Sequence, residues 1–487
     1  MMEIQTSKSD LVFLVICALL GLLAELSFFH GEIGISYFLF VTAFYWAFFW
    51  RFRGFPFTNR RIGFLLLFCI WLLSAGYFLY CNTLFYALNI LVIPVLVILH
   101  VILITGSPTL DWYRLSFIPY TFSKLFALFP YNIAFFAKEK ENVKTKVDNK
   151  AYQVITKIGI GLLISVPLLL IVVNLLSSAD SEFSRVIDRL PSLFVHVNLL
   201  EGSFRTIVVL LYTFGFFGFL QLLKSKWEPP ALLEMKGKPK FWDPVIVSTL
   251  LVLINAVYVL FVTIQFQYFF SGNLQDSYTF AEYARRGFFE LMAVTMINLT
   301  FLIGTLSFSK ESGKGIRLFI KVMLTLLVAV SGVMLISAFM RLSLYESAYG
   351  YTLARVLPHS FMIFLGVIFL YTLVNVWIER LSLIRFYLIS SLVYYTLLNM
   401  VNIDQFVVDQ NLQRYKDTGK IDIYYLDSLS YTGVDGLLDL YESHPDLPGL
   451  EKALFDRKKY TFAEDHSWQS FNIVKRSMRE RLQEFSK

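Results

Sequence analysis

The sequence predicts an all-α, polytopic transmembrane helix bundle of about eleven spans, followed by a small helical soluble domain at the C-terminus. Three observations predict this class. Hydrophobic residues make up 56% of the 487 residues and charged residues only 16%, whereas about a quarter of a soluble domain is charged. The apolar residues gather into runs of about 20, the length that crosses a bilayer as a helix. The residues after 401 are polar instead. This composition excludes a soluble enzyme, a fibrous protein, a disordered chain and a secreted disulfide scaffold.

Eleven apolar runs give the expected spans. They lie at approximately 11–29, 34–50, 62–80, 83–104, 155–176, 206–223, 244–269, 287–306, 318–340, 361–377 and 386–401. The chain then divides into a four-helix membrane segment (1–104), a cytoplasmic interfacial loop and charged linker (105–154), a seven-helix membrane core (155–401) and a soluble helical tail (402–487). The first run is too long for the core of a signal peptide, so we expect the first helix to remain as a signal anchor.

The long loop between the fourth and fifth expected spans has two parts. Residues 107–138 are aromatic, but Pro119 and Pro130 interrupt them, so this part predicts interfacial helices that lie among the lipid headgroups. Residues 138–150 are highly charged and predict a solvated linker near anionic lipid.

The distribution of lysine and arginine predicts the orientation. With the N-terminus in the cytoplasm, the cytoplasmic segments carry 22 of these residues and the outer loops only 7, as the positive-inside rule requires. We therefore expect a multi-pass protein of the bacterial plasma membrane. Eleven spans place the tail outside the cytoplasm. The tail has a net charge of −3, and residues 467–485 form an amphipathic pattern.

Several kinds of site are not predicted. Cys17 and Cys69 lie in apolar runs, Cys81 lies at the end of one, and none has a partner at the spacing of metal ligands. No sequence motif indicates a metal, a cofactor or nucleic acid, and the positive-inside bias accounts for the overall charge of +7. The lipid bilayer is the one partner that the composition requires.

The charged residues on the outer side are the candidate functional residues. In FAEYARRGFFEL (280–291), Glu282, Arg286 and Glu290 follow one another at four-residue spacing and share a helical face, while Arg285 points elsewhere. Glu290 lies at the membrane boundary, where an unpaired carboxylate is costly.

A second charged segment, RLSLYESAYGYTLARVLPHS (341–360), joins the ninth and tenth spans. Arg341 shares a face with Tyr345, and Arg355 shares a face with His359. Glu346 is able to pair with one of the arginines.

Together these residues predict one outward-facing polar site. Arg285, Arg286, Arg341 and Arg355 would hold an anion, and Glu282 and Glu290 would orient them, because guanidinium groups suit phosphate and carboxylate ligands. The alternative interpretation is a set of salt bridges that fix loops onto helix ends.

Three classes of function remain open. The first is binding or transport of an anionic ligand, either a small molecule or a lipid-linked envelope component. The second is an envelope transferase that acts on a lipid-linked substrate, with His359 or Glu290 as its general base. The third is a sensor or assembly scaffold that contacts a protein partner through the tail (402–487).

The order of several motifs resembles a known family. AEYARRGFFEL (281–291), RLSLYESAYGYTLARV (341–356), NMVNIDQFVVDQNLQRY (399–415) and IDIYYLDSLSYTGVDGLLDL (421–440) follow one another, and SSADSEFSRVID (177–188) precedes them. This pattern, over residues 155–440, is similar to the bacterial integral membrane domain-of-unknown-function family 4173, which is related to family 4153. The resemblance implies a bacterial multi-pass membrane protein. It implies no activity and assigns no catalytic residue.

Overall fold

Every element in the described part of the chain is a helix. The computed structural model describes residues 7–107, 111–114, 116–144, 165, 199–225, 227, 242–269, 288–308, 313–378, 381–463 and 467–485. The helices of the membrane part are α1 (Lys8–Phe28), α2 (Ile35–Arg51), α3 (Arg60–Leu79), α4 (Thr83–Thr105), α5 (Phe117–Lys144), α8 (Leu199–Lys224), α9 (Pro244–Phe269), α11 (Phe288–Phe308), α12 (Lys314–Tyr349), α13 (Leu353–Trp377) and α14 (Leu383–Met400).

Nine helices of the described residues are long and apolar enough to cross a membrane, and the chain is a multi-pass membrane protein. These nine are α1, α3, α4, α8, α9, α11, α12, α13 and α14. Helix α2 has 17 residues, near the lower limit for a span. Of the span expected at 155–176, only residue 165 is described, so the count of eleven stays a prediction.

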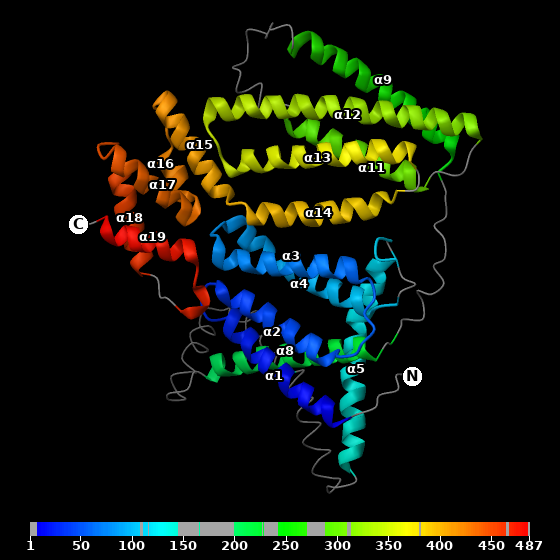
Figure 1. The fold of residues 1–487 in the computed structure, drawn as a ribbon, viewed down its shortest axis with the longest axis vertical. Helices are drawn as coiled ribbons and strands as arrows, with labels where there is room; N and C mark the ends of the chain where they lie inside the picture. Colours follow the sequence, from blue (N-terminus) through cyan, green and yellow to red (C-terminus); the bar gives the residue numbers. More distant parts are fainter. Residues whose placement is uncertain are drawn as a thin grey trace, which may run out of the picture.

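The membrane helices form two packed groups. In the first group, a buried aromatic core joins α1–α5 and α8. In the second, α9 and α11–α13 share a separate aliphatic core, and α14 lies between the groups, against α3 (Figure 1). The sequence places residues 199–224 with the later spans, but α8 packs along α1 instead. Gly21 permits this close approach, because a Cβ atom there would lie 2.6 Å from the carbonyl oxygen of Val209.

Amides in the middle of the spans connect neighbouring helices. Asn89 on α4 donates to Asn399 on α14 over 2.7 Å, and Tyr395 donates to Asn89 over 2.6 Å. Asn298 on α11 donates to Ser331 on α12 over 2.8 Å. Hydrogen bonds between side chains are a main source of specific association where lipid removes the hydrophobic driving force.

Helix α5 differs from the broken segment that the prolines predict. It is one continuous helix of 28 residues, because Pro119 lies in its first turn, where a missing N–H group costs nothing. Pro130 lies inside the helix. Figure 1 shows α5 running across the direction of the spans, at the end of the bundle where α1 begins.

The polar tail folds into short helices, as the sequence predicts. They are α15 (Ile403–Thr418), α16 (Ile423–Ser428), α17 (Ser430–Ser443), α18 (Leu450–Ala463), the 3₁₀ helix η2 (Trp468–Ser470) and α19 (Ile473–Glu484). Their shared apolar core also includes Phe85 of α4 and packs against Leu353 and Leu398 of the spans. In Figure 1 the tail lies at the opposite end of the bundle from the beginning of α1.

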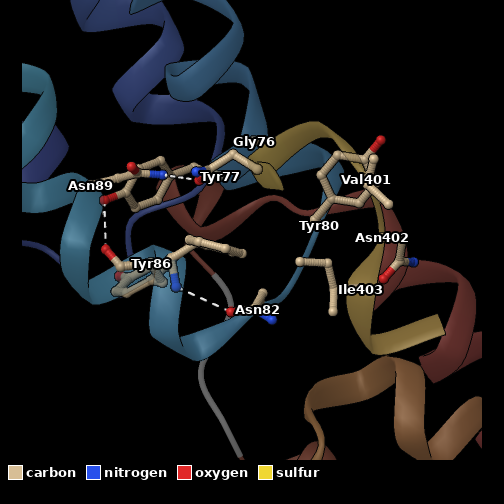
Figure 2. Close-up of a pocket in the computed structure, with 11 residues that line it drawn as sticks. Gly76, Tyr77, Tyr80, Asn82, Tyr86, Asn89, Val401, Asn402 and Ile403 are labelled. Atoms are coloured by element: carbon tan, nitrogen blue, oxygen red, sulfur yellow. Dashed lines mark hydrogen bonds between the residues drawn. The ribbon is translucent and has the colours of Figure 1, made fainter. Parts of the chain in front are cut away.

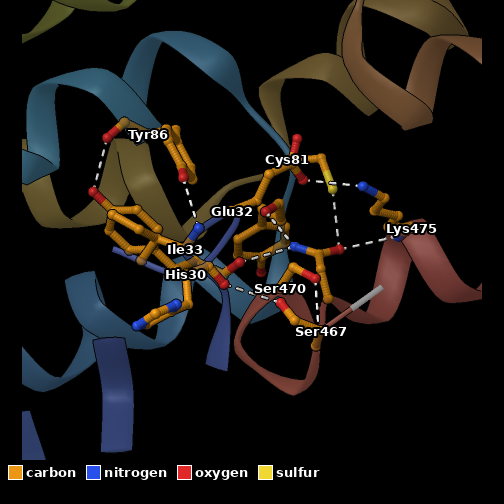
Figure 3. A network of polar contacts seen from close by, with 11 residues as sticks. His30, Glu32, Ile33, Cys81, Tyr86, Ser467, Ser470 and Lys475 are labelled. Atoms are coloured by element: carbon orange, nitrogen blue, oxygen red, sulfur yellow. Dashed lines mark hydrogen bonds and ion pairs between the residues drawn. The ribbon is translucent and has the colours of Figure 1, made fainter. Parts of the chain in front are cut away.

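Polar contacts fix the end of the tail to the loops between the first four helices (Figure 3). The backbone N–H of Ile35 donates to the carbonyl of Phe471 over 3.1 Å. Lys475 pairs with Glu32 at 3.0 Å, and Ser467 donates to the carbonyl of His30 over 3.2 Å. These contacts hold η2 and α19 against the same ends of the spans that carry the α12–α13 turn.

Candidate functional site

The turn between α12 and α13 gathers polar side chains at the end of the bundle that faces the tail. Helix α12 ends at Gly350, whose N–H donates to the carbonyl of Glu346 over 2.8 Å. Gly350 has φ +87°, a conformation that favours glycine. The chain therefore turns within three residues, and α13 returns antiparallel beside α12. Polar residues on the last turns of α12 and the first turns of α13 thus become neighbours.

A glutamate, a histidine and a serine form a hydrogen-bonded chain across this turn. Glu346 is 4% exposed, and its Oε2 lies 2.8 Å from Nδ1 of His359. The other ring nitrogen, Nε2, lies 3.2 Å from the hydroxyl of Ser343. The second carboxylate oxygen of Glu346 is buried and has no hydrogen-bond partner among the described residues. His359 is therefore the hydrogen-bond partner of this buried acid in the described part of the chain.

Arg355 rests on an aromatic surface one helical turn from His359. Its guanidinium lies 4.2 Å from the ring centre of Tyr345 and 5.9 Å from that of Tyr349, and it donates to the carbonyl of Gly350. No carboxylate of the described residues pairs with it. This cation is half-buried and held in place by rings rather than by an acid.

Arg414 of α15 reaches the same turn from the tail. It donates to the carbonyl of Ala348 over 2.9 Å and to that of Lys420 over 3.4 Å, and within the described ranges it makes no ion pair. Both arginines thus meet the C-terminal end of α12, where the helix dipole favours cations. Arg414 is not among the residues predicted from the sequence, because the packing of α15 on this turn cannot be recognised in a local sequence pattern.

The other candidate residues lie elsewhere or outside the described residues. Arg341 is 7% exposed and lies one turn before Tyr345 on α12. Glu290 is exposed in the first turn of α11. Glu282, Arg285 and Arg286 lie outside the described residues. The structure thus places Arg355 and His359 one turn apart on α13, and the roles of all the predicted site residues stay predictions.

A small cavity lies between α3, α4 and the beginning of α15 (Figure 2). Its volume is about 30 Å³, which is enough to hold ordered water. Tyr77, Asn82 and Asn89 face Asn402 and neighbouring residues across it. The amide groups of Asn82 and Asn89 are already hydrogen-bonded within the protein, and the cavity is too small for a lipid headgroup.

Comparison with known proteins places the chain in a family. No curated protein and no solved structure matches it. A family model described as a domain of unknown function (DUF4153) matches residues 67–440, from within α3 to within α17, so the match extends further toward the N-terminus than the motifs predict. The sequence motifs indicate the related family 4173, and that finer assignment stays a prediction. Because the matched region includes most of the spans and half of the tail, the chain belongs to the DUF4153 family.

Proposed function

We propose that this protein binds an anionic, phosphate-bearing ligand at the α12–α13 turn, on the outer side of a bacterial plasma membrane. The chemistry suits a lipid headgroup or an envelope-derived intermediate, and binding is either an end in itself or a step in transport. The observation that carries this proposal is Arg355, a half-buried cation that rests on Tyr345 and has no carboxylate partner in the described part of the chain.

The surroundings of Arg355 support an anion in preference to other ligands. Arg414 brings a second guanidinium to the same turn, and phosphate is a ligand that guanidinium groups bind through paired hydrogen bonds. The buried acid of this turn, Glu346, is directed at His359. Spare positive charge therefore remains at the turn. The turn also lies between the spans expected at 318–340 and 361–377, so it would meet the headgroup side of the bilayer.

Substitution of Arg355 tests this proposal. Native mass spectrometry in a neutral detergent measures binding of phosphatidylglycerol, with phosphatidylcholine as a zwitterionic reference and inorganic phosphate as a free anion. We expect Arg355→Gln to weaken phosphatidylglycerol binding about tenfold or more, because a hydrogen bond to a charged group contributes about 1.5–3 kcal/mol. If inorganic phosphate competes with the lipid, the site recognises the phosphate group alone. If inorganic phosphate does not compete, binding requires the rest of the lipid as well.

Arg385 provides a matched control for this substitution. Its guanidinium also lies 4.2 Å from a tyrosine ring centre, that of Tyr113, but it is in the first turn of α14, at the opposite end of the bundle. Arg385→Gln therefore removes an equivalent stacked cation without touching the turn. Equal loss of binding in both variants, or unchanged binding in Arg355→Gln, contradicts the proposal.

A further inference from the structure

The polar chain beside the proposed anion site has the composition of an acyl-transfer centre. Ser343, His359 and Glu346 lie in the order hydroxyl, imidazole, carboxylate, with separations of 3.2 Å and 2.8 Å. We infer that these three residues form a Ser-His-Glu site that transfers the acyl group of a phosphate-bearing lipid ester. This inference rests on the proposed function, because Arg355 holds the phosphate of that lipid.

Each side chain has the environment that its role requires. The carboxylate of Glu346 is buried and faces Nδ1, which favours hydrogen on Nδ1. Nε2 lies 3.2 Å from the Ser343 hydroxyl and 3.3 Å from the carbonyl oxygen of Phe339, and in the reactive arrangement it accepts from Ser343. The ring of Phe339 lies 4.2 Å from the ring of His359 and limits its rotation. The hydroxyl of Ser343 donates to the carbonyl of Phe339 over 3.0 Å. Rotation of this hydroxyl directs its proton to Nε2 instead and prepares the oxygen for attack.

The depth of the site selects the class of substrate. Arg355 and His359 are four residues apart on α13, which is about 6 Å along the helix axis. Arg355 is nearer the beginning of α13, and His359 lies one turn closer to the span expected at 361–377. In a glycerophospholipid the acyl esters likewise lie a few bonds from the phosphate, toward the hydrocarbon core. A phosphate at Arg355 therefore brings an ester carbonyl to the level of His359 and Ser343.

The reaction at this site is balanced without an oxidant or a metal. The Ser343 oxygen attacks the ester carbonyl, and Nε2 of His359 takes the hydroxyl proton. The bond from the carbonyl carbon to the lipid alcohol oxygen then breaks, and His359 gives the proton to that oxygen. The acyl group is now on Ser343. A second alcohol, or water, attacks it through the same histidine, which restores the serine and releases the acyl product.

A fluorophosphonate probe tests the nucleophile directly. Such a probe forms a covalent bond to an activated serine oxygen and releases fluoride, and peptide mass spectrometry locates the modified residue. In the full-length protein we expect labelling at Ser343. Ser343→Ala should abolish it, and His359→Gln should slow it by about a hundredfold, the usual contribution of a general base. Ser347 is the matched control, since this exposed serine lies one turn further along α12 and donates to the carbonyl of Ser343. Ser347→Ala should label normally.

Glu346 is a positioning residue and needs a separate readout. Glu346→Gln should slow labelling, while Glu346→Asp, which keeps a carboxylate, should restore part of the rate. Both variants should bind phosphatidylglycerol as the wild type does. If Glu346→Asp binds the lipid but is labelled no faster than Glu346→Gln, Glu346 only fills space in the core. Its role in positioning His359 is then overturned.

An experiment with a lipid substrate distinguishes failure of acyl transfer at Ser343 from failure of anion binding at Arg355. Phosphatidylglycerol with a radiolabelled acyl chain in phosphatidylcholine vesicles should place the label on Ser343, and less of it in Arg355→Gln. If the wild type binds this lipid but labels Ser343 no faster than Ser347, acyl transfer is overturned and anion binding stands. If the probe labels Ser343 but Arg355→Gln transfers acyl groups normally, the serine centre is supported and the anion site is contradicted.

Discussion

At the residue scale, the buried acid Asp404 makes the stability of the tail depend on pH. This acid is 2% exposed, and it accepts hydrogen bonds from Asn82 over 2.8 Å and from Ser430 over 2.9 Å. Burial raises the pKa of the Asp404 carboxyl, although the two hydrogen bonds oppose this. An acid whose pKa is higher in the folded protein stabilises the fold at low pH. Its contribution is lost as the pH rises from the unfolded pKa, about 3.9, through the folded one.

We therefore expect Asp404→Asn to raise the thermal unfolding midpoint near neutral pH. The gain should shrink as the pH falls, because protonation removes the buried charge from the wild type as well. Thermal unfolding in detergent over a series of pH values measures the difference. Asp409→Asn, an exposed acid on the same helix, is the control and should follow the wild type. A lower midpoint for Asp404→Asn at neutral pH would mean that the hydrogen bonds of the carboxylate outweigh its burial.

Pairing between residues was predictable only within one helix. Four-residue spacing identifies Arg355 and His359 as neighbours, and the structure places both at the α12–α13 turn. The sequence pairs Glu346 with an arginine, whereas the structure pairs it with His359. That contact joins two helices, and its geometry depends on their crossing and on the tight turn at Gly350. Arg414 was not predicted for the same reason, since its partner carbonyl at Ala348 belongs to another helix.

At the element scale, Asn472 connects the last helix of the tail to the spans. Its amide group donates to the carbonyls of Tyr77 and Tyr80 over 2.9 and 2.8 Å. Its side-chain oxygen accepts a hydrogen bond from the backbone N–H of Lys475, and this bond caps α19. The same oxygen accepts a hydrogen bond from the thiol of Cys81 over 3.0 Å. One side chain thus begins α19 and attaches it to the end of α3.

We expect Asn472→Ala to make Cys81 about 5–30 times more reactive toward a thiol reagent. Loss of a cap costs about 1–2 kcal/mol, and such a change alters an equilibrium by that factor. Burial raises the pKa of the Cys81 thiol to about 12, so it reacts slowly at neutral pH until the tail moves away. The rate is measured in protein whose Cys17 and Cys69 are replaced by alanine.

The variant Asn402→Ala distinguishes the loss of a helix cap from the loss of the contact between the tail and the spans. Asn402 caps α15 by accepting the N–H of Gln405 over 3.2 Å, and it makes no side-chain hydrogen bond to a span in the described residues. This variant should lose helix stability but leave Cys81 protected. Equal reactivity in the two variants would mean that Asn472 acts only as a cap.

The positions of the helices were more predictable than their grouping. Runs such as 62–80 and 83–104 closely match α3 and α4, because a span needs a fixed length of apolar chain. The grouping of the spans depends on local contacts, such as the close approach of two helices at Gly21. Hydropathy alone does not predict such contacts. For this reason the sequence groups residues 199–224 with the later spans, while the structure packs them against α1.

At the scale of the whole molecule, the structure separates two ends of the bundle. The tail, the α12–α13 turn and the loops 29–34 and 80–82 lie at one end (Figure 1). The beginnings of α1, α3, α9, α12 and α14 lie at the other, together with the basic segment 51–61. Because the positive-inside rule assigns this basic end to the cytoplasm, Arg355 and the tail should face outward.

Single-cysteine labelling tests this orientation. We replace the native cysteines, introduce one cysteine at Ser443 of the tail or at Arg53 of the basic end, both exposed, and treat intact cells with a membrane-impermeant thiol reagent. We expect labelling at position 443 and protection at position 53 until the membrane is opened. The two sites must differ, because the fold places them at opposite ends.

Each departure from this result has a distinct meaning. Equal labelling of both sites in intact cells would contradict the fold, since no orientation exposes both ends to one side. If position 53 is labelled and position 443 is protected, the fold is correct but its orientation in the membrane is the reverse of the one expected. Arg355, Arg414 and His359 would then face the cytoplasm. The anion site would meet lipids of the inner leaflet, and an envelope-derived ligand would be excluded.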